Sequence, residues 1–165
     1  MVSRFADQLL ESIDGEQFYR DARLEPASRP GEIRPRDIER VQAQVQAALD
    51  QAAGDHWFGE LVTEPRYAAL PDDDDLAEAR AELRDGCNVV ELAASAKIAW
   101  QQEASGIIVY ANGDSQVFTE EVLPAVIELC DSWKLEGDAL AGALQAPAAT
   151  ELLDYLLQSG CIYVE

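Results

Sequence analysis

The sequence predicts an α+β fold in which an all-helical segment precedes a small mixed domain. Three observations lead to this prediction. Apolar residues recur at helical spacing along the first 64 residues, an Asn-Gly pair separates two apolar runs at 112–113, and the chain closes with the short apolar run CIYVE. With 165 residues, of which 48% are apolar, the chain is long enough for one domain or two small ones.

The helical segment spans residues 1–64 and is expected to contain three helices. The first carries an apolar stripe from Val2 to Ile13. The second runs from Pro35 to about Ala53, because proline suits the first turn and apolar residues then repeat at intervals of three and four. The third follows Asp55 as its N-cap and stops before Pro65.

This helical segment has little core of its own, because small domains bury a low fraction of their surface. The apolar seam of the second helix, with Ile38, Val41 and Val45, extends over about two heptads, which is too short for a free coiled coil. We therefore expect the apolar side chains of this segment to be buried against other helices, of the same chain or of a partner.

A change in composition marks the start of the mixed domain. Two prolines and a run of four acidic residues in PRYAALPDDDD predict a linker over 65–71 and a second domain over 72–165. Asp72–Asp75 then precede an apolar helix face, and Gly86 is expected to follow as its C-terminal cap. N-capping and the positive end of the helix dipole explain the acidic run better than a Ca²⁺ or Mg²⁺ site does, because the run lacks the ligand spacing of an EF-hand.

Short strands and a hairpin are expected next. Alternation of apolar with polar or small residues predicts strands around Val90–Leu92 and Ile98–Trp100. Asn112-Gly113 lies between the apolar runs IIVY and QVF. Both central residues of a type I′ turn need positive φ, so this pair predicts a tight hairpin.

Two helices and a strand complete the mixed domain. One helix is expected to begin near Pro124 and to carry Val126, Ile127, Cys130 and Trp133 on its apolar face. A leucine-rich helix closed by Gly160 precedes the final strand. This order of elements fits a small α+β domain of winged-helix character.

The charge of the chain opposes binding to nucleic acid or to an anionic membrane. The formal net charge is −20, and residues 71–165 carry 19 acidic against 4 basic side chains. Contacts to phosphate need lysine and arginine, and the two most helical stretches of the C-terminal half contain neither. No apolar run is long enough to cross a bilayer, and we expect a cytoplasmic protein.

The sequence offers little catalytic chemistry. Its one histidine, His56, is interpreted as a residue at a helix start or interface, and no nucleotide-binding glycine motif is present. Cys87, Cys130 and Cys161 form no CxxC pair and are expected to be buried, reduced thiols.

Several segments occur in an order that matches a known protein family. They are FADQLLE, FYRDARLEPASRPGEI, HWFGELVTEPR, VYANG, GDAL and LLQSGCIYVE. Together they resemble the region after the catalytic domain in bacterial ribosomal oxygenases, which are JmjC/cupin-type enzymes. Those enzymes depend on Fe(II) and 2-oxoglutarate and hydroxylate an arginine of a large-subunit ribosomal protein. The resemblance extends over nearly all of the chain and depends on the order and spacing of the segments.

The resemblance implies an architecture without a catalytic site. Residues 1–64 would be the dimerisation helices, residues 72–165 would be the acidic winged-helix-like domain, and the catalytic cupin barrel would be absent. The family's HxD…H iron ligands do not occur in this sequence, so no catalytic, cofactor-binding or metal-binding residue carries over. Fe(II) and 2-oxoglutarate belong to the parent enzyme's barrel. The chain would be a C-terminal part or a relative that lost its barrel, and the position of Met1 after the expected barrel favours the former.

The first functional hypothesis is therefore a non-catalytic part of such an oxygenase that forms a homodimer. Its acidic surface could attract a basic ribosomal protein. The alternative is a free-standing acidic adaptor or regulator that binds a basic protein, and an enzyme in its own right is the least favoured reading. The candidate dimer-interface residues are Phe5, Leu9, Ile38, Val41, Val45, Trp57 and Phe58.

Overall fold

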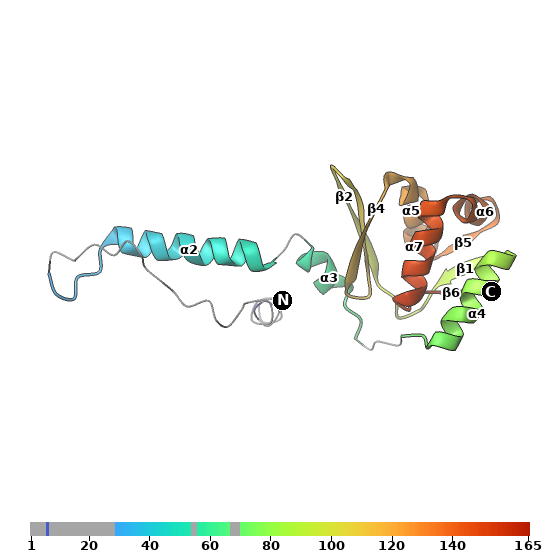
Figure 1. The fold of residues 1–165 in the computed structure, drawn as a ribbon, viewed down its shortest axis with the longest axis horizontal. Helices are drawn as coiled ribbons and strands as arrows, with labels where there is room; N and C mark the ends of the chain where they lie inside the picture. Colours follow the sequence, from blue (N-terminus) through green and yellow to red (C-terminus); the bar gives the residue numbers. More distant parts are fainter. Residues whose placement is uncertain (1–5, 7–28, 54–55, 67–69) are drawn as a thin grey trace. The chain divides into compact units, whose positions relative to one another are not determined.

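The computed structural model describes residues 6, 29–53, 56–66 and 70–165 (Figure 1). The chain divides into two compact units, residues 1–57 and 58–165. The domain limits predicted from the sequence stay a prediction. The helix predicted over the first residues, and with it Phe5 and Leu9, lies outside the described residues apart from Ala6.

The described part of the first unit consists mainly of the helix α2, Pro35–Ala53, whose bounds agree with the prediction. Its first turn contains Asp37, which accepts a 2.7 Å hydrogen bond from Arg34 Nε. This contact is the main cause of a pKa of Asp37 below its ordinary value. A negative charge in the first turn also complements the helix dipole.

The second unit contains two three-stranded antiparallel sheets with helices between and around them. The strand order is β5-β1-β6 in one sheet and β2-β3-β4 in the other. The helices are α3 (Trp57–Thr63), α4 (Asp73–Asp85), the 3₁₀ helix η1 (Glu120–Val122), α5 (Leu123–Ser132), α6 (Gly137–Gln145) and α7 (Pro147–Gln158). The strands are β1 (Val89–Leu92), β2 (Ile98–Glu103), β3 (Gly106–Ala111), β4 (Asp114–Phe118), β5 (Lys134–Glu136) and β6 (Ile162–Val164).

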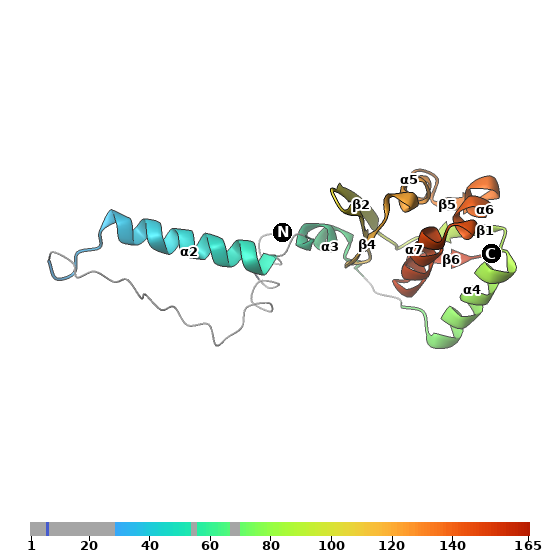
Figure 2. The same ribbon diagram turned by 45° about the horizontal axis from the view of Figure 1, so that its top comes forward.

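The helix α7 lies between the two sheets (Figures 1 and 2). Its buried side chains include Leu152, Leu153 and Leu156, which are at most 1% exposed. The ring of Tyr155 packs 5.7 Å from that of Phe118 at the end of β4. Because α7 contacts β4 on one side and β6 on the other, it joins both sheets into one core.

The predicted hairpin is confirmed. Ala111 pairs with Asp114, so the loop is the two residues Asn112 and Gly113, with φ of 49° and 93°. Positive φ at both positions is what a type I′ turn requires. Asn112 Nδ2 also donates a 2.8 Å hydrogen bond to the carbonyl oxygen of Ser159, so the turn is fixed to the end of α7.

The helix α4 begins and ends as predicted. Asp72 is its N-cap, and its carboxylate accepts hydrogen bonds from the backbone N–H groups of Asp74 and Asp75 at 3.0 and 2.9 Å. Gly86 is its C-cap with φ of 95°, a conformation that glycine adopts without strain. The acidic run therefore has the capping role expected of it.

Three features differ from the prediction or were missed by it. Trp133 does not extend the apolar face of α5, because it caps the helix in the left-handed conformation with φ of 64° and is 57% exposed. The short strand β5 and the helix α6 follow it directly. The run α5–β5–α6–α7–β6 has the order of a winged helix, and β1 supplies the central strand from earlier in the chain.

The helix α3 packs closely on the hairpin sheet. A Cβ atom at Gly59 would overlap the ring of Tyr110 on β3, and the hydroxyl of Thr63 accepts a 3.2 Å hydrogen bond from the N–H of Gly113. Thr63 is 2% exposed, and its hydroxyl donates to the carbonyl oxygen of Gly59 at 2.8 Å. The close approach of α3 to β3 therefore depends on glycine at position 59.

We predict that Gly59→Ala lowers the free energy of unfolding by about 1–3 kcal/mol, because the added methyl group overpacks the contact with Tyr110. Urea unfolding followed by circular dichroism measures this. The matched control is Gly142→Ala in α6, where no atom lies within 4 Å of the added Cβ. Alanine in a helix interior should stabilise that variant by about 0.5–1 kcal/mol. Equal stability of the two variants would contradict the prediction.

Candidate interaction surface

The predicted dimer-interface residues of α2 form an exposed apolar stripe on that helix. Ile38, Val41 and Val45 are 49%, 44% and 54% exposed. Their spacing of three and four residues places them on one helix face. Within the described part of the first unit they have no apolar core to cover them. Such a stripe is typical of a surface that another helix covers.

The other interface candidates lie at the start of α3. Trp57 is half-buried, and Phe58 is 52% exposed. The structure therefore places Ile38, Val41 and Val45 on one helix face. Trp57 and Phe58 are consecutive residues, and the boundary between the two units falls between them. The structure describes neither Phe5 nor Leu9.

The helix pair α6–α7 occupies the position of a helix-turn-helix, but its side chains serve the core. Neither helix contains a basic residue. The leucines of α7 are buried, and its exposed positions include Glu151 and Gln158. A helix that enters a DNA groove needs cationic and amide side chains on its outer face. Helix α7 has no cationic side chain, and the absence of nucleic-acid binding stays a prediction.

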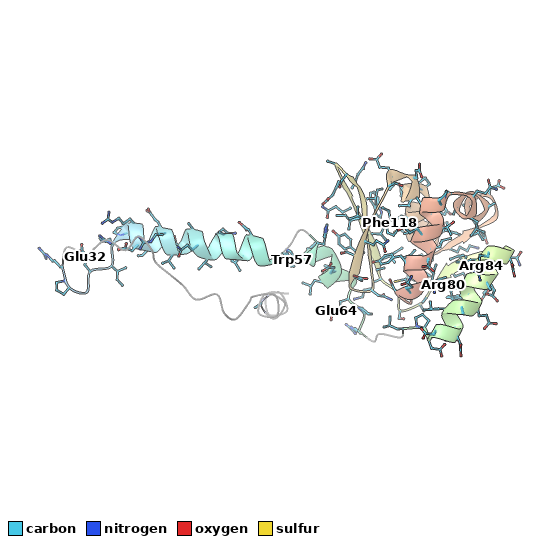
Figure 3. All side chains as sticks on the ribbon, in the orientation of Figure 1. Glu32, Trp57, Glu64, Arg80, Arg84 and Phe118 are labelled. Atoms are coloured by element: carbon cyan, nitrogen blue, oxygen red, sulfur yellow. The ribbon has the colours of Figure 1, made fainter. Side chains whose placement is uncertain are left out.

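The two arginines of α4 lie on the side of this helix that borders α7. Arg80 and Arg84, labelled in Figure 3, border a hollow beside α7, and Arg80 Nη2 donates to Asp154 Oδ2 at 3.1 Å. The hydrogen bond from Arg80 is the main cause of a pKa of Asp154 below its ordinary value of 3.8. The basic flank of α4 is thus partly neutralised by α7.

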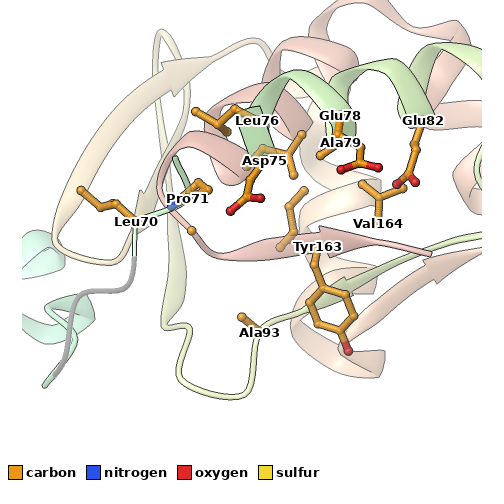
Figure 4. Close-up of a pocket in the computed structure, with 13 residues that line it drawn as sticks. Leu70, Pro71, Asp75, Leu76, Glu78, Ala79, Glu82, Ala93, Tyr163 and Val164 are labelled. Atoms are coloured by element: carbon orange, nitrogen blue, oxygen red, sulfur yellow. The ribbon is translucent and has the colours of Figure 1, made fainter. Parts of the chain in front are cut away.

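The acidic flank of α4 borders a groove against β6. Its three carboxylates are Asp75, Glu78 and Glu82, and all three are exposed. The groove has a volume of about 570 Å³, and Figure 4 shows α4 above the strand that carries Tyr163 and Val164. Apolar side chains of α4, α7 and β6 form its floor, among them Leu76, Ala79, Leu157 and Ile162.

Metal ligands do not cluster in the part of the chain that the structure describes. The described residues contain no group of three or more histidine, cysteine, aspartate or glutamate side chains that could hold a metal ion. His56 is half-buried just before α3, at a helix start as expected. Cys161 is buried, and burial raises the pKa of its thiol to about 12, whereas Cys87 and Cys130 are only half-buried. A thiol with a raised pKa is a poor nucleophile.

The described part of the chain also contains no helix that is both long enough and apolar enough to cross a membrane.

Comparison with known proteins identifies relatives of the whole chain. Residues 44–163 match the family described as ROXA-like winged helix. The chain is 25% identical over 173 aligned positions to the "Ribosomal protein uL16 3-hydroxylase" of Escherichia coli (strain K12), a match that covers 100% of this chain and 44% of that protein. The chain therefore spans less than half the length of this relative.

Solved structures show the same fold. The ribosomal oxygenase YcfD from Escherichia coli aligns with a TM-score of 0.66 and 23% identity, over 99% of this chain and 45% of that one. The same oxygenase in complex with cobalt and 2-oxoglutarate aligns with a TM-score of 0.66 and 24% identity, over the same shares of both chains. The aligned region is the C-terminal part of the oxygenase, so the winged-helix fold is confirmed and the barrel has no counterpart here.

We predict that the contribution of Asp154 to stability depends on pH. A lowered pKa in the folded state stabilises the protein above the unfolded-state pKa, and this stability is lost as the pH falls through the lower folded-state value. Asp154→Asn should cost about 0.5 kcal/mol at neutral pH, a small value because both partners are solvent-screened.

Urea unfolding of Asp154→Asn and of the unchanged chain, at neutral pH and again well below the ordinary carboxyl pKa of 3.8, tests this. The two proteins should differ in stability at neutral pH and converge in acid. Asp131→Asn, at an exposed position on α5, serves as the control and should not destabilise at either pH. A difference that grows in acid would contradict the prediction.

Proposed function

Since this chain belongs to the ROXA-like winged-helix family, we propose that it is the non-catalytic part of an Fe(II)- and 2-oxoglutarate-dependent ribosomal-protein arginine hydroxylase. In this proposal it dimerises through its helical segment and presents an acidic surface to a basic ribosomal protein. The observation that carries the proposal is the family match over 44–163 together with the alignment of the whole chain to less than half of a ribosomal-protein hydroxylase.

The metal and co-substrate of the relatives do not fit the residues of this chain. The sequence contains one histidine and no HxD motif, and the described residues hold no metal-ligating cluster. A facial iron site needs two histidines and a carboxylate. We therefore assign the iron and 2-oxoglutarate to the catalytic domain of the parent enzyme and assign no chemical step to this chain.

The dimerisation part of the proposal is supported by the exposed stripe on α2. Ile38, Val41 and Val45 would lose their exposed apolar surface against a second copy, with a gain of about 25 cal/mol per Å² before the cost of association. A fixed dimer would hold two catalytic domains in a constant relation to each other.

The acidic part of the proposal is supported by the charge of the second half of the chain. Residues 71–165 carry 19 acidic and 4 basic side chains, so their field attracts a basic protein from beyond contact distance. Attraction of this kind increases the rate of encounter and aligns the partner before contact.

We predict that the chain is a homodimer in solution and that Val41→Glu weakens the dimer by about 100-fold or more, because an unpaired carboxylate buried in the seam costs several kcal/mol. Light scattering over a concentration series measures this. Ala47→Glu, at an exposed position on the opposite side of α2, is the matched control and should leave dimer affinity nearly unchanged. A monomer at every concentration would refute dimerisation.

We also predict that the affinity for a lysine- and arginine-rich peptide falls by about tenfold between low salt and physiological salt, because the screening length shortens from about 30 Å to about 8 Å. Isothermal titration calorimetry at the two salt concentrations measures the change. The control is a peptide of the same length with glutamine in place of each basic residue, which should not bind at either salt concentration. Binding of the basic peptide that is insensitive to salt would contradict the role of the acidic surface.

A further inference from the structure

We propose that the groove between α4 and β6 is where a basic partner docks, as an extended segment that pairs with the outer edge of β6. This inference rests on the proposed function, because it takes the partner to be basic. It adds the place of binding, the conformation of the bound segment and the side chains that this segment needs.

The acidic charge along the groove is uncompensated. Asp75, Glu78 and Glu82 are spaced by three and four residues, so they share one flank of α4. Among the described residues, none of the three carboxylates accepts a hydrogen bond or lies within 4 Å of a cationic side chain. Like charges four residues apart destabilise a helix, so Glu78 and Glu82 repel each other until a cation lies between them.

The arginines of the same helix do not relieve this repulsion. Arg80 is bound to Asp154 of α7, and Arg84 borders the hollow on that same side of α4. The only cationic residues after Arg84 are Lys97 and Lys134, and neither lines the groove. Cations from a partner could therefore neutralise this flank without displacing an existing ion pair.

An apolar floor lies between the carboxylates and the strand β6. Leu76 and Ala79 of α4 face Ile162 and Val164 of β6 across it, and Leu157 closes its end. Figure 4 shows the side chain of Val164 directed toward α4 and that of Tyr163 directed away. Lysine and arginine have long aliphatic stems with a charged end, so they can cover such a floor while their charges reach the carboxylates at its rim.

The strand β6 lies at the edge of its sheet. Val89 and Glu165 exchange two backbone hydrogen bonds of 3.2 and 3.1 Å, and the N–H of Ala93 donates to the carbonyl of Cys161 at 2.8 Å. Backbone groups alternate in direction along an antiparallel strand, so those of Ile162 and Val164 point away from β1. Because β6 is the last strand of its sheet, these groups have no neighbouring strand among the described residues.

These three features together select one kind of occupant. An unpaired strand edge binds an extended chain through main-chain hydrogen bonds, and pockets beside the edge give specificity by accommodating alternate side chains of the bound chain. Here those side chains meet an apolar floor with carboxylates along one rim. The occupant is therefore an extended segment in which lysine or arginine alternates with small apolar residues.

The test uses the full 165-residue chain and an acetylated, amidated peptide in which arginine and valine alternate. Isothermal titration calorimetry at low salt compares the unchanged chain with the double variant Glu78→Gln/Glu82→Gln. The matched control is Glu121→Gln/Asp131→Asn, which removes the same charge from exposed positions elsewhere in the second unit. Melting curves by circular dichroism establish that both variants are folded.

We expect the groove variant to bind the peptide about tenfold more weakly and the control variant to change affinity by less than about twofold. If both variants lose the same affinity for the peptide, the peptide is attracted to the acidic surface in general and the groove is not the binding site. If the peptide does not bind the unchanged chain, both the groove and the proposed basic partner are refuted.

A second probe tests the strand pairing separately. The same peptide with methylated backbone nitrogens at alternate residues keeps its charge but loses the N–H groups that face one side. Methylation on the residues that face β6 should weaken binding about tenfold, and methylation on the other set should have little effect. Equal affinity of the two methylated peptides would refute pairing with β6.

Discussion

The burial of α7 is the constraint on which the second unit depends. Its leucines supply the centre of the core, and Tyr155 packs on Phe118 while its hydroxyl donates to the carbonyl of Val109 at 3.4 Å. In a winged helix that reads DNA, the outward face of this helix carries the contacts to bases. Here α7 contacts both sheets and α4, so its surface is used mainly for internal packing. The exposed apolar stripe of α2, in contrast, takes no part in this core.

Local signals in the sequence predicted most of the elements. Pro35 begins α2, Asp72 and Gly86 delimit α4, and Asn112-Gly113 forms the hairpin turn, because each of these residues acts through its own backbone conformation or through a cap within a few residues. The missed elements lack such signals. The strand β5 is three residues long and is defined by its pairing with β1, more than 40 positions earlier. The helix α6 begins at Gly137 and contains Gly142, which weakens its local helical preference.

The candidate surfaces were predictable to different extents. The apolar stripe of α2 follows from spacing alone, because a single helix fixes which residues share a face. The groove does not, because it is built from α4 and β6, which lie about 80 residues apart and meet only through the tertiary fold. The sequence predicted the helix α4 and the capping role of the acidic residues at its start. That Arg80 turns to Asp154 and leaves Glu78 and Glu82 on the other flank depends on where α7 lies.

The place of β1 in its sheet has a consequence for biosynthesis. This strand is central, yet it leaves the ribosome before both of its neighbours, and the whole β2–β3–β4 hairpin sheet is synthesised between β1 and β5. At about 5–20 residues per second, β1 waits for several seconds with both edges open. The nascent chain can close its hairpin early, because those contacts are local, whereas the sheet β5-β1-β6 is complete only after β6 has been synthesised. Loss of β6 would therefore leave one edge of the central strand β1 unpaired, and such an edge is a template for pairing with another chain.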